Sequence, residues 1–205
     1  MSKFEPQYIT ACAVYEDASE KQIGNAITNA TNVTAPDTLI NQDTHINNNE
    51  FDEFELTFSS RAPVAPSFPE QYSAIYCNVI EEDVFHTHIY AEIEDVEDLL
   101  NFQKKLMSDF NDILLSNYTV AFSVDASTSE FVDSLSDITI SSDNIKMKNM
   151  RLEVGDWNVN LAESADELMI WVSKRTSDEI EPSDLTGMSE NMVEETSNVL
   201  EGLVE

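Results

Sequence analysis

The chain has 205 residues, of which 41% are hydrophobic, and its 40 acidic residues outnumber the 10 basic ones to give a formal net charge of −30 at pH 7. This length and apolar content can bury the core of one domain, while a surface this negative excludes nucleic acid and anionic membranes as direct partners. No apolar run approaches the roughly 18 residues that span a bilayer and the first residues lack a secretory signal, so we expect a cytoplasmic protein, or a virion component if the chain is viral.

The first part of the chain predicts a strand, a helix and a long loop. Residues 7–15 are apolar on both faces of a strand, which is typical of a central position in a sheet. Ser19 and Gln22 form a capping-box pair ahead of a short amphipathic helix. Residues 32–50 are polar and rich in Asn, so we expect a surface loop there. Residues 53–58 alternate between apolar and polar side chains and predict a half-buried strand.

The middle of the chain predicts a hairpin followed by a long helix. Strands at 72–80 and 84–93 are separated by an acidic turn. After them, apolar residues recur at three- and four-residue steps over about 95–116, which is the period of one helix face. Asp95 is placed to cap this helix, and a strand at 118–124 follows it. The helix face consists of Val96, Leu99, Leu100, Gln103, Leu106, Met107, Phe110, Ile113 and Leu114.

The second half of the chain has a less regular pattern. A short helix at 129–135 precedes several short strands, two of which are joined by a turn at Gly155-Asp156. Residues 164–175 fit either a capped helix or a strand, and we favour the helix. The predicted short strands are 137–140, 145–150, 152–154 and 157–161.

These elements predict an α+β fold with a largely antiparallel sheet packed by the long central helix. The first half is close to a split βαβ arrangement with an added strand, and the second half adds short strands and then a helix. We assign residues 1–175 to a single α+β domain, 176–187 to an acidic linker and 188–205 to a C-terminal amphipathic helix. That helix either docks on the domain or binds a partner, which includes oligomerisation with a second copy.

His86 and His88 form the sharpest chemical pattern in the sequence. Strand alternation places both imidazoles on one face, and two histidines with a carboxylate can hold a divalent metal. The spacing His86-x-His88-x3-Glu92 resembles the core of the cupin metal motif, and that resemblance implies that these three residues are metal ligands. The flanking glycines and the later histidine of cupins are missing from this chain. We therefore favour the alternative of two hydrogen-bonded histidines on the polar face of a strand, and we expect no cofactor.

The sequence contains no recognisable nucleophile motif. There is no G-x-S-x-G, the four glycines form no phosphate-binding loop, and neither cysteine lies beside a histidine in the sequence. Cys12 and Cys77 both fall in predicted strands, where a small thiol usually fills a core. We therefore expect a protein that is not an enzyme, with a metal-dependent enzyme that uses His86 and His88 as a lower-ranked alternative.

The acidity itself is the remaining functional signal. The composition resembles that of proteins from salt-in halophiles, in which acidic surfaces are adapted to concentrated salt. We therefore expect an interaction or assembly protein with a halophile-type surface, of cellular, viral or mobile-element origin. The alternative is a DNA mimic or immunity-type inhibitor that occupies the basic surface of a nucleic-acid-binding protein or a toxin. The candidate contact residues are Glu50, Asp52, Glu53 and Glu55 in one row and Glu92, Glu94, Glu97 and Asp98 in another.

Overall fold

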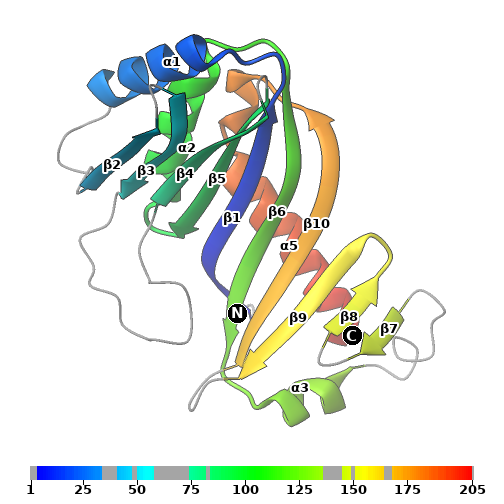
Figure 1. Cartoon of the computed structure of the whole chain (residues 1–205). Coiled ribbons are helices and arrows are strands. Elements are labelled where there is room, and N and C mark those ends of the chain that lie inside the picture. Colours follow the sequence, from blue (N-terminus) through cyan, green and yellow to red (C-terminus); the bar gives the residue numbers. More distant parts are fainter. Residues whose placement is uncertain are drawn as a thin grey trace. The chain divides into compact units, whose positions relative to one another are not determined.

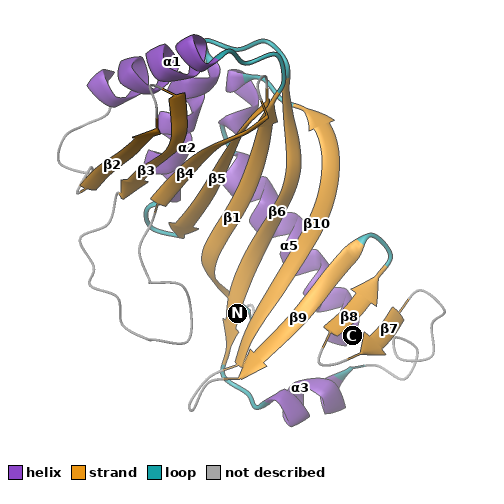
Figure 2. Ribbon diagram, in the orientation of Figure 1, coloured by secondary structure: helices purple, strands orange, loops and turns teal. Residues whose placement is uncertain are grey.

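The computed structural model describes residues 4–33, 41–47, 50–57, 74–81, 84–135, 145–148, 151–163 and 168–204. The fold belongs to the predicted α+β class, with the elements shown in Figures 1 and 2. None of the helices in these residues is long and apolar enough to cross a membrane. In chain order the elements are β1 (Glu5–Tyr15), α1 (Glu20–Val33), β2 (Asn41–Asn47), β3 (Glu50–Thr57), β4 (Ala74–Glu81), β5 (Val84–Glu92), α2 (Val96–Met107), β6 (Ile113–Val124), α3 (Thr128–Ser134), β7 (Ile145–Lys148), β8 (Arg151–Val154), β9 (Trp157–Glu163), β10 (Leu168–Glu179), the 3₁₀ helix η1 (Pro182–Leu185) and α5 (Met188–Val204).

The strands follow the hydrogen-bonded order β2-β3-β4-β5-β1-β6-β10-β9-β8-β7. The chain divides into two compact units, each of which is described by itself below. The N-terminal unit comprises 9–117 and 176–189, and the C-terminal unit comprises 1–8, 118–175 and 190–205. Strands β1, β6 and β10 contribute residues to both units.

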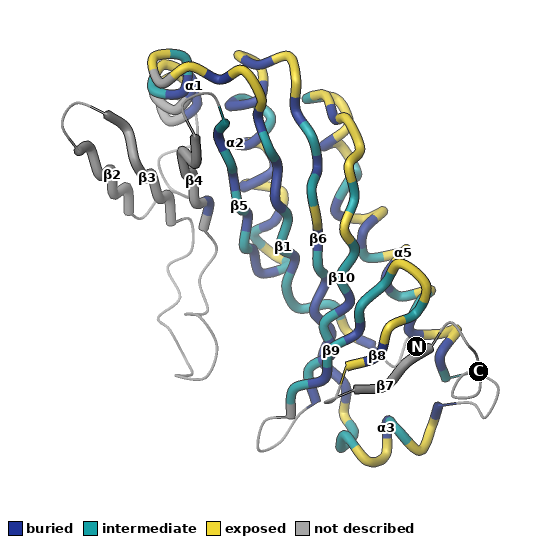
Figure 3. Tube along the Cα trace, turned by 45° about the vertical axis from the view of Figure 1, so that its right-hand side comes forward, coloured by how far each residue is buried: buried dark blue, intermediate teal, exposed yellow. Residues whose placement is uncertain are grey.

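The N-terminal unit packs helix α2 against one face of its strands (Figure 2). Tyr15, Phe85 and Phe110 form an aromatic cluster with ring centroids 4.9 to 6.0 Å apart. Figure 3 shows buried residues along β1, β5 and α2 and exposed residues in the turns at the strand ends. Strand β1 lies between β5 and β6, which confirms its predicted central position. Helix α2 therefore buries its apolar face in this unit, as an amphipathic helix packed on a sheet does. The buried residues of α2 are Val96, Leu99, Leu100, Phe102, Gln103, Leu106 and Met107.

The predicted length of the central helix is wrong. Helix α2 ends at Met107, and strand β6 begins at Ile113, so the prediction of a helix over about 95–116 merged two elements. Ser108 ends the helix with a side-chain hydrogen bond of 2.7 Å to the carbonyl of Lys105. Asp95 occupies the N-cap position, but its side chain makes no capping hydrogen bond, contrary to the prediction.

The predicted loop at 32–50 is also wrong. Helix α1 continues to Val33, and residues 41–47 form strand β2, which pairs antiparallel with β3. The register shifts between His45 and Ile46, which marks a bulge. Strands β3, β4 and β5 continue the antiparallel pairing, as the sequence predicted for the last two.

The C-terminal unit contains an antiparallel meander of β7, β8, β9 and β10. Gly155 has a φ of +58° in the turn between β8 and β9, which confirms the predicted hairpin. Residues 168–175 are strand, so the helix favoured for 164–175 is wrong. Leu168, Ile170 and Val172 alternate as buried residues because they face the core of the unit. The predicted strand at 137–140 lies outside the described residues.

The two predicted C-terminal segments have defined structure. Residues 176–187, expected as a linker, contain the end of β10 and the helix η1. The final helix is present as α5. It buries Met192, Leu200 and Leu203, together with the hydroxyl-bearing Thr196.

Candidate functional site

A hollow of about 350 Å³ in the N-terminal unit is lined by nine residues, five of which are acidic and none basic. We call it the acidic groove. All five acidic residues are exposed, whereas its lining also includes the apolar residues Ile113, Leu114 and Ile180. The groove therefore combines dense negative charge with some apolar surface. Its acidic residues are Glu16, Asp112, Glu179, Glu181 and Asp184.

Backbone hydrogen bonds tie together the three segments that form the acidic groove. The amide of Glu16 donates to the carbonyl of Asp112 at 3.1 Å, which joins the β1–α1 and α2–β6 connections. The amide of Ile180 donates to the carbonyl of Ile113 at 2.9 Å, which joins the end of β10 to the start of β6. The amide of Glu181 donates to the Asp184 carboxylate at 2.7 Å. The two backbone bonds hold the three segments together, and the third bond orients the Asp184 carboxylate.

The sequence-predicted acidic rows lie elsewhere. Glu94, Glu97 and Asp98 are exposed at the start of α2, as expected for a contact surface. Glu92 is only 8% exposed, and the Glu97 carboxylate accepts a hydrogen bond of 2.9 Å from the Ser189 hydroxyl. The second row, Glu50, Asp52, Glu53 and Glu55, belongs to β3, and the placement of those side chains lies outside the described part of the structure.

A second cluster joins His86 and His88 on β5 to Cys12 on the neighbouring strand β1. The Cys12 sulfur lies 3.7 Å from Nε2 of His88, and one ligand atom from each of the three residues lies within 4.8 Å of the others. The two imidazole rings are 6.1 Å apart between centroids. Glu92, the third member of the sequence-predicted metal set, is not part of this group. The structure thus brings the histidines together with a thiol whose position in a predicted strand indicated only core filling.

Burial sets the protonation of this cluster. It raises the pKa of the Cys12 thiol, an effect that a hydrogen bond with the Ser116 side chain opposes. Burial also lowers the pKa of His86 and of His88, and repulsion from His86 lowers the pKa of His88 further. All three shifts favour the neutral forms at neutral pH. Cys12 is 4% exposed and forms no disulfide.

A buried polar network lies on the opposite side of β5. The side-chain amide of Gln103 on α2 donates to the hydroxyls of Tyr15 and Thr87, the latter at 2.8 Å. The Thr87 hydroxyl lies 3.5 Å from that of Tyr15. Oε1 of Gln103 has no hydrogen-bond partner among the described residues, although the residue is 2% exposed. A buried acceptor without a partner destabilises the fold, so substitutions in this network should change the free energy of unfolding measurably.

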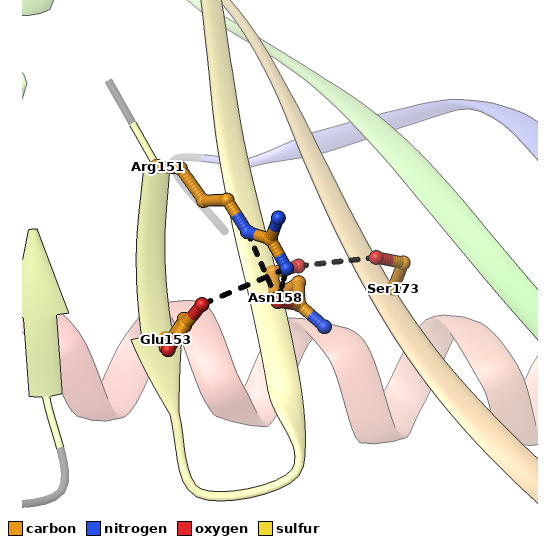
Figure 4. Close-up of polar contacts among 4 residues, drawn as sticks. All are labelled: Arg151, Glu153, Asn158 and Ser173. Carbon is orange, nitrogen blue, oxygen red and sulfur yellow. Dashed lines mark hydrogen bonds and ion pairs between the residues drawn. The ribbon is translucent and has the colours of Figure 1, made fainter. Parts of the chain in front are cut away.

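Arg151 forms a small polar cluster with Glu153, Asn158 and Ser173 in the C-terminal unit (Figure 4). Arg151 lies 3.7 Å from Glu153 and hydrogen-bonds Asn158, whose carbonyl accepts a bond of 3.4 Å from the Ser173 hydroxyl. The side chains of Arg151 and Glu153 are about half exposed, at 49% and 51%. An ion pair this exposed contributes little to stability, and Arg151 is engaged with its neighbours.

Comparison with known proteins identifies no family. No family model matches the chain, and no curated protein matches it. Among solved structures, the chain is similar to the di-domain ARO/CYC StfQ from the steffimycin biosynthetic pathway, with 8% identity and a TM-score of 0.28. The similarity covers 95% of this chain and 96% of that chain. A TM-score this low supports no inference about fold or function.

Both candidate sites depend on contacts that a single sequence does not display. The acidic groove draws on three connections that are distant along the chain. Acidic residues at strand ends were visible in the sequence, but only the strand order shows which ends meet. Cys12 is separated from His88 by 76 positions, and its pairing requires β1 to lie next to β5.

Proposed function

We propose that this protein is a non-enzymatic interaction protein that binds a basic segment of a partner protein in the acidic groove. The observation that supports this proposal is the convergence of five exposed carboxylates on one hollow without a lining cation. Electrostatic complementarity of this kind accelerates association and selects the partner. The hollow is within the size range of ordinary binding pockets, about 300 to 1,000 Å³, so it can hold a few side chains of a bound segment.

The acidic groove is a better candidate surface than the row at the start of α2. In that row, Glu92 is buried and its carboxylate is not presented to a partner, whereas all five carboxylates of the acidic groove belong to exposed residues. In the groove, main-chain hydrogen bonds hold the three segments together. Preorganised charges bind more tightly than mobile ones because less conformational entropy is lost on association.

The partner is a protein with clustered Lys or Arg side chains. A nucleic-acid-binding protein or a basic toxin has this character, so the inhibitor hypothesis describes one class of partner for the same surface. Carboxylates that occupy such a basic surface take the place of phosphate groups and displace its counterions. Binding of this kind weakens steeply as the salt concentration rises.

The test uses a short fluorescent oligolysine peptide as the probe and titrates it against three proteins at several KCl concentrations. The groove variant combines Glu16→Gln, Asp112→Asn and Glu179→Gln, and it spares Asp184 because that residue accepts the Glu181 amide. The matched control removes three exposed carboxylates of the C-terminal unit, through Asp133→Asn, Glu194→Gln and Glu201→Gln. Both variants lose the same net charge, so only the position of the charge differs.

We expect the groove variant to lose between about threefold and a hundredfold in affinity for the peptide, since each of its three surface pairs contributes about 0.2 to 1 kcal/mol. The affinity of the groove variant for the peptide should also fall less steeply with rising KCl concentration than that of the wild type. The control variant should retain most of the affinity. Equal losses in both variants would show that the peptide responds to net charge alone, and the groove would then have no special role.

A further inference from the structure

We propose that Cys12, His86 and His88 form a mononuclear binding site for a divalent transition metal ion of the zinc class. This inference does not depend on the acidic groove, because the three residues belong to the faces of β1 and β5 rather than to the connections that line the groove. It also differs from the sequence-derived metal hypothesis, in which Glu92 was the third ligand.

The backbone presents the three donor atoms from two adjacent strands. His86 and His88 are two residues apart on β5, so they share one face of the strand. Phe85, Thr87 and Ile89 are buried on the other face, which fixes the orientation of β5. Cys12 lies on β1, the hydrogen-bonded neighbour of β5. Ligands carried on paired strands are more rigid than ligands carried on loops, which reduces the entropy lost when an ion binds.

The distances are close to those that a bound ion requires. A tetrahedral zinc ion with bonds of about 2.3 Å to sulfur and about 2.0 Å to nitrogen places those two atoms about 3.5 Å apart. The Cys12 sulfur and Nε2 of His88 are 3.7 Å apart. The ligand atom of His86 lies within 4.8 Å of the other two, so binding of an ion requires its side chain to rotate closer to them. Three protein ligands leave the fourth position of the ion for water or for a ligand.

The donor set selects the class of metal. One thiolate and two imidazoles suit zinc, copper and nickel, whereas calcium and magnesium prefer oxygen ligands. Binding replaces the thiol proton, so one proton is released for each ion bound. The two histidines are partly exposed, which gives the ion a route from solvent, while Cys12 is buried beneath them. Ser116 hydrogen-bonds the Cys12 side chain and also donates to the Cys12 carbonyl at 3.2 Å, so it supports the sulfur ligand.

A cysteine nucleophile activated by His88 is the competing interpretation, because the fold brings Cys12 next to a histidine that is distant from it in the sequence. Two features argue against that interpretation. Cys12 is 4% exposed, which leaves little access for a substrate, and a ligand atom of the second histidine, His86, also lies within 4.8 Å of the sulfur. A cysteine nucleophile needs only one histidine as its base, which would leave His86 without a role. A metal site uses all three donors, Cys12, His86 and His88.

The experiment loads metal-free full-length protein with Zn²⁺ in about 1 M KCl with excess Mg²⁺, conditions that screen carboxylates and saturate their weak cation sites. Bound zinc is counted after gel filtration, and a zinc-chelating dye measures the affinity by competition. Co²⁺ serves as a spectroscopic substitute, since a thiolate ligand gives it a charge-transfer absorption in the near ultraviolet. The ligand variants are Cys12→Ser, His86→Ala and His88→Ala.

The chain supplies matched controls of the same chemistry. Cys77→Ser removes the other cysteine, and His45→Ala removes the remaining histidine. Cys77 pairs with Thr87 in the β4–β5 register, so it lies opposite neither His86 nor His88. Glu92→Gln tests the sequence-derived ligand set directly. Circular dichroism and thermal unfolding of every metal-free variant show whether it retains the wild-type fold.

We expect one zinc ion per chain and a cobalt–thiolate absorption that disappears in Cys12→Ser. Each ligand variant that folds should lose at least about tenfold in zinc affinity, because even an outer-shell partner typically contributes that much. The three controls should bind zinc as the wild type does. Substoichiometric zinc in the wild type, or full zinc binding in Cys12→Ser and His88→Ala, would overturn the proposal. If Glu92→Gln alone abolished binding, the sequence-derived set would replace the proposed one.

Discussion

Replacement of Thr87 and Gln103, singly and together, gives the sharpest test of the packing in the N-terminal unit. Tyr15, Thr87 and Gln103 are 0%, 1% and 2% exposed, so their polar groups depend on one another. Thr87→Val keeps the shape of the side chain and removes its hydroxyl. Gln103→Leu removes both donated hydrogen bonds, and it also removes the orphan Oε1.

The hydrogen bonds set the expected free energies of unfolding. Thr87→Val deprives the Gln103 amide of a buried acceptor at 2.8 Å, which should cost about 1 to 2 kcal/mol. Gln103→Leu should cost about 1 kcal/mol or less, because the lost bonds are offset by removal of the orphan acceptor. In that variant the hydroxyls of Thr87 and Tyr15 remain 3.5 Å apart and can bond each other. The double variant should therefore cost about as much as Thr87→Val alone.

Urea unfolding of the four proteins in concentrated KCl measures this cycle. The double variant should be more stable than the sum of the single effects predicts by the cost of Gln103→Leu, up to about 1 kcal/mol, since contacting residues are coupled. Additivity within about 0.3 to 0.5 kcal/mol would show that the three side chains do not act as one network.

Three other measurements test the electrostatics and polar contacts. The melting temperature should rise steeply from low salt to about 1 M KCl, where screening shortens the reach of charge repulsion to about 3 Å, and a flat profile would contradict salt adaptation. Tyr118→Phe should cost about 1 kcal/mol in unfolding experiments, because it removes a hydrogen bond of 2.6 Å to the Glu195 carboxylate, and an unchanged stability would refute that contact. The amide and hydroxyl of Ser127 lower the pKa of the exposed Glu130 below its ordinary value of 4.5. The ionised form of Glu130 therefore contributes stability above that pH, and this contribution is lost on acidification. An NMR titration of the Glu130 carboxyl should show the lowered pKa as a lowered midpoint.

The sequence predicted elements well where a local pattern determined them. The alternation in β5 placed His86 and His88 on one face, and the apolar character of β1 indicated its central position. The helix was overextended because Phe110, Ile113 and Leu114 continue its spacing by coincidence. In the structure, Phe110 packs on the rings of Tyr15 and Phe85, and a strand starts at Ile113. Tertiary packing therefore decides between continuing the helix and starting a strand in this segment, two alternatives that the local pattern does not separate.

The missed features share a non-local cause. Strand β2 is polar, and it was assigned to a loop because its structure comes from pairing with β3 rather than from its own pattern. The acidic groove and the position of Cys12 require knowledge of which strands are neighbours. The spacing in β5 therefore identified the two histidines of the proposed metal site, and only the strand order identified Cys12.

The division of the chain into two interleaved units affects how the protein can be made. Residues 176–189 complete the N-terminal unit, and residues 190–205 complete the C-terminal unit. Neither unit is complete while the ribosome is still adding these residues, so the usual order in which an N-terminal domain folds first during synthesis does not apply here. A nascent chain that stops before residue 176 would leave apolar strands of both units without their last partners. We expect such truncated products to aggregate or be degraded rather than to persist as a folded half.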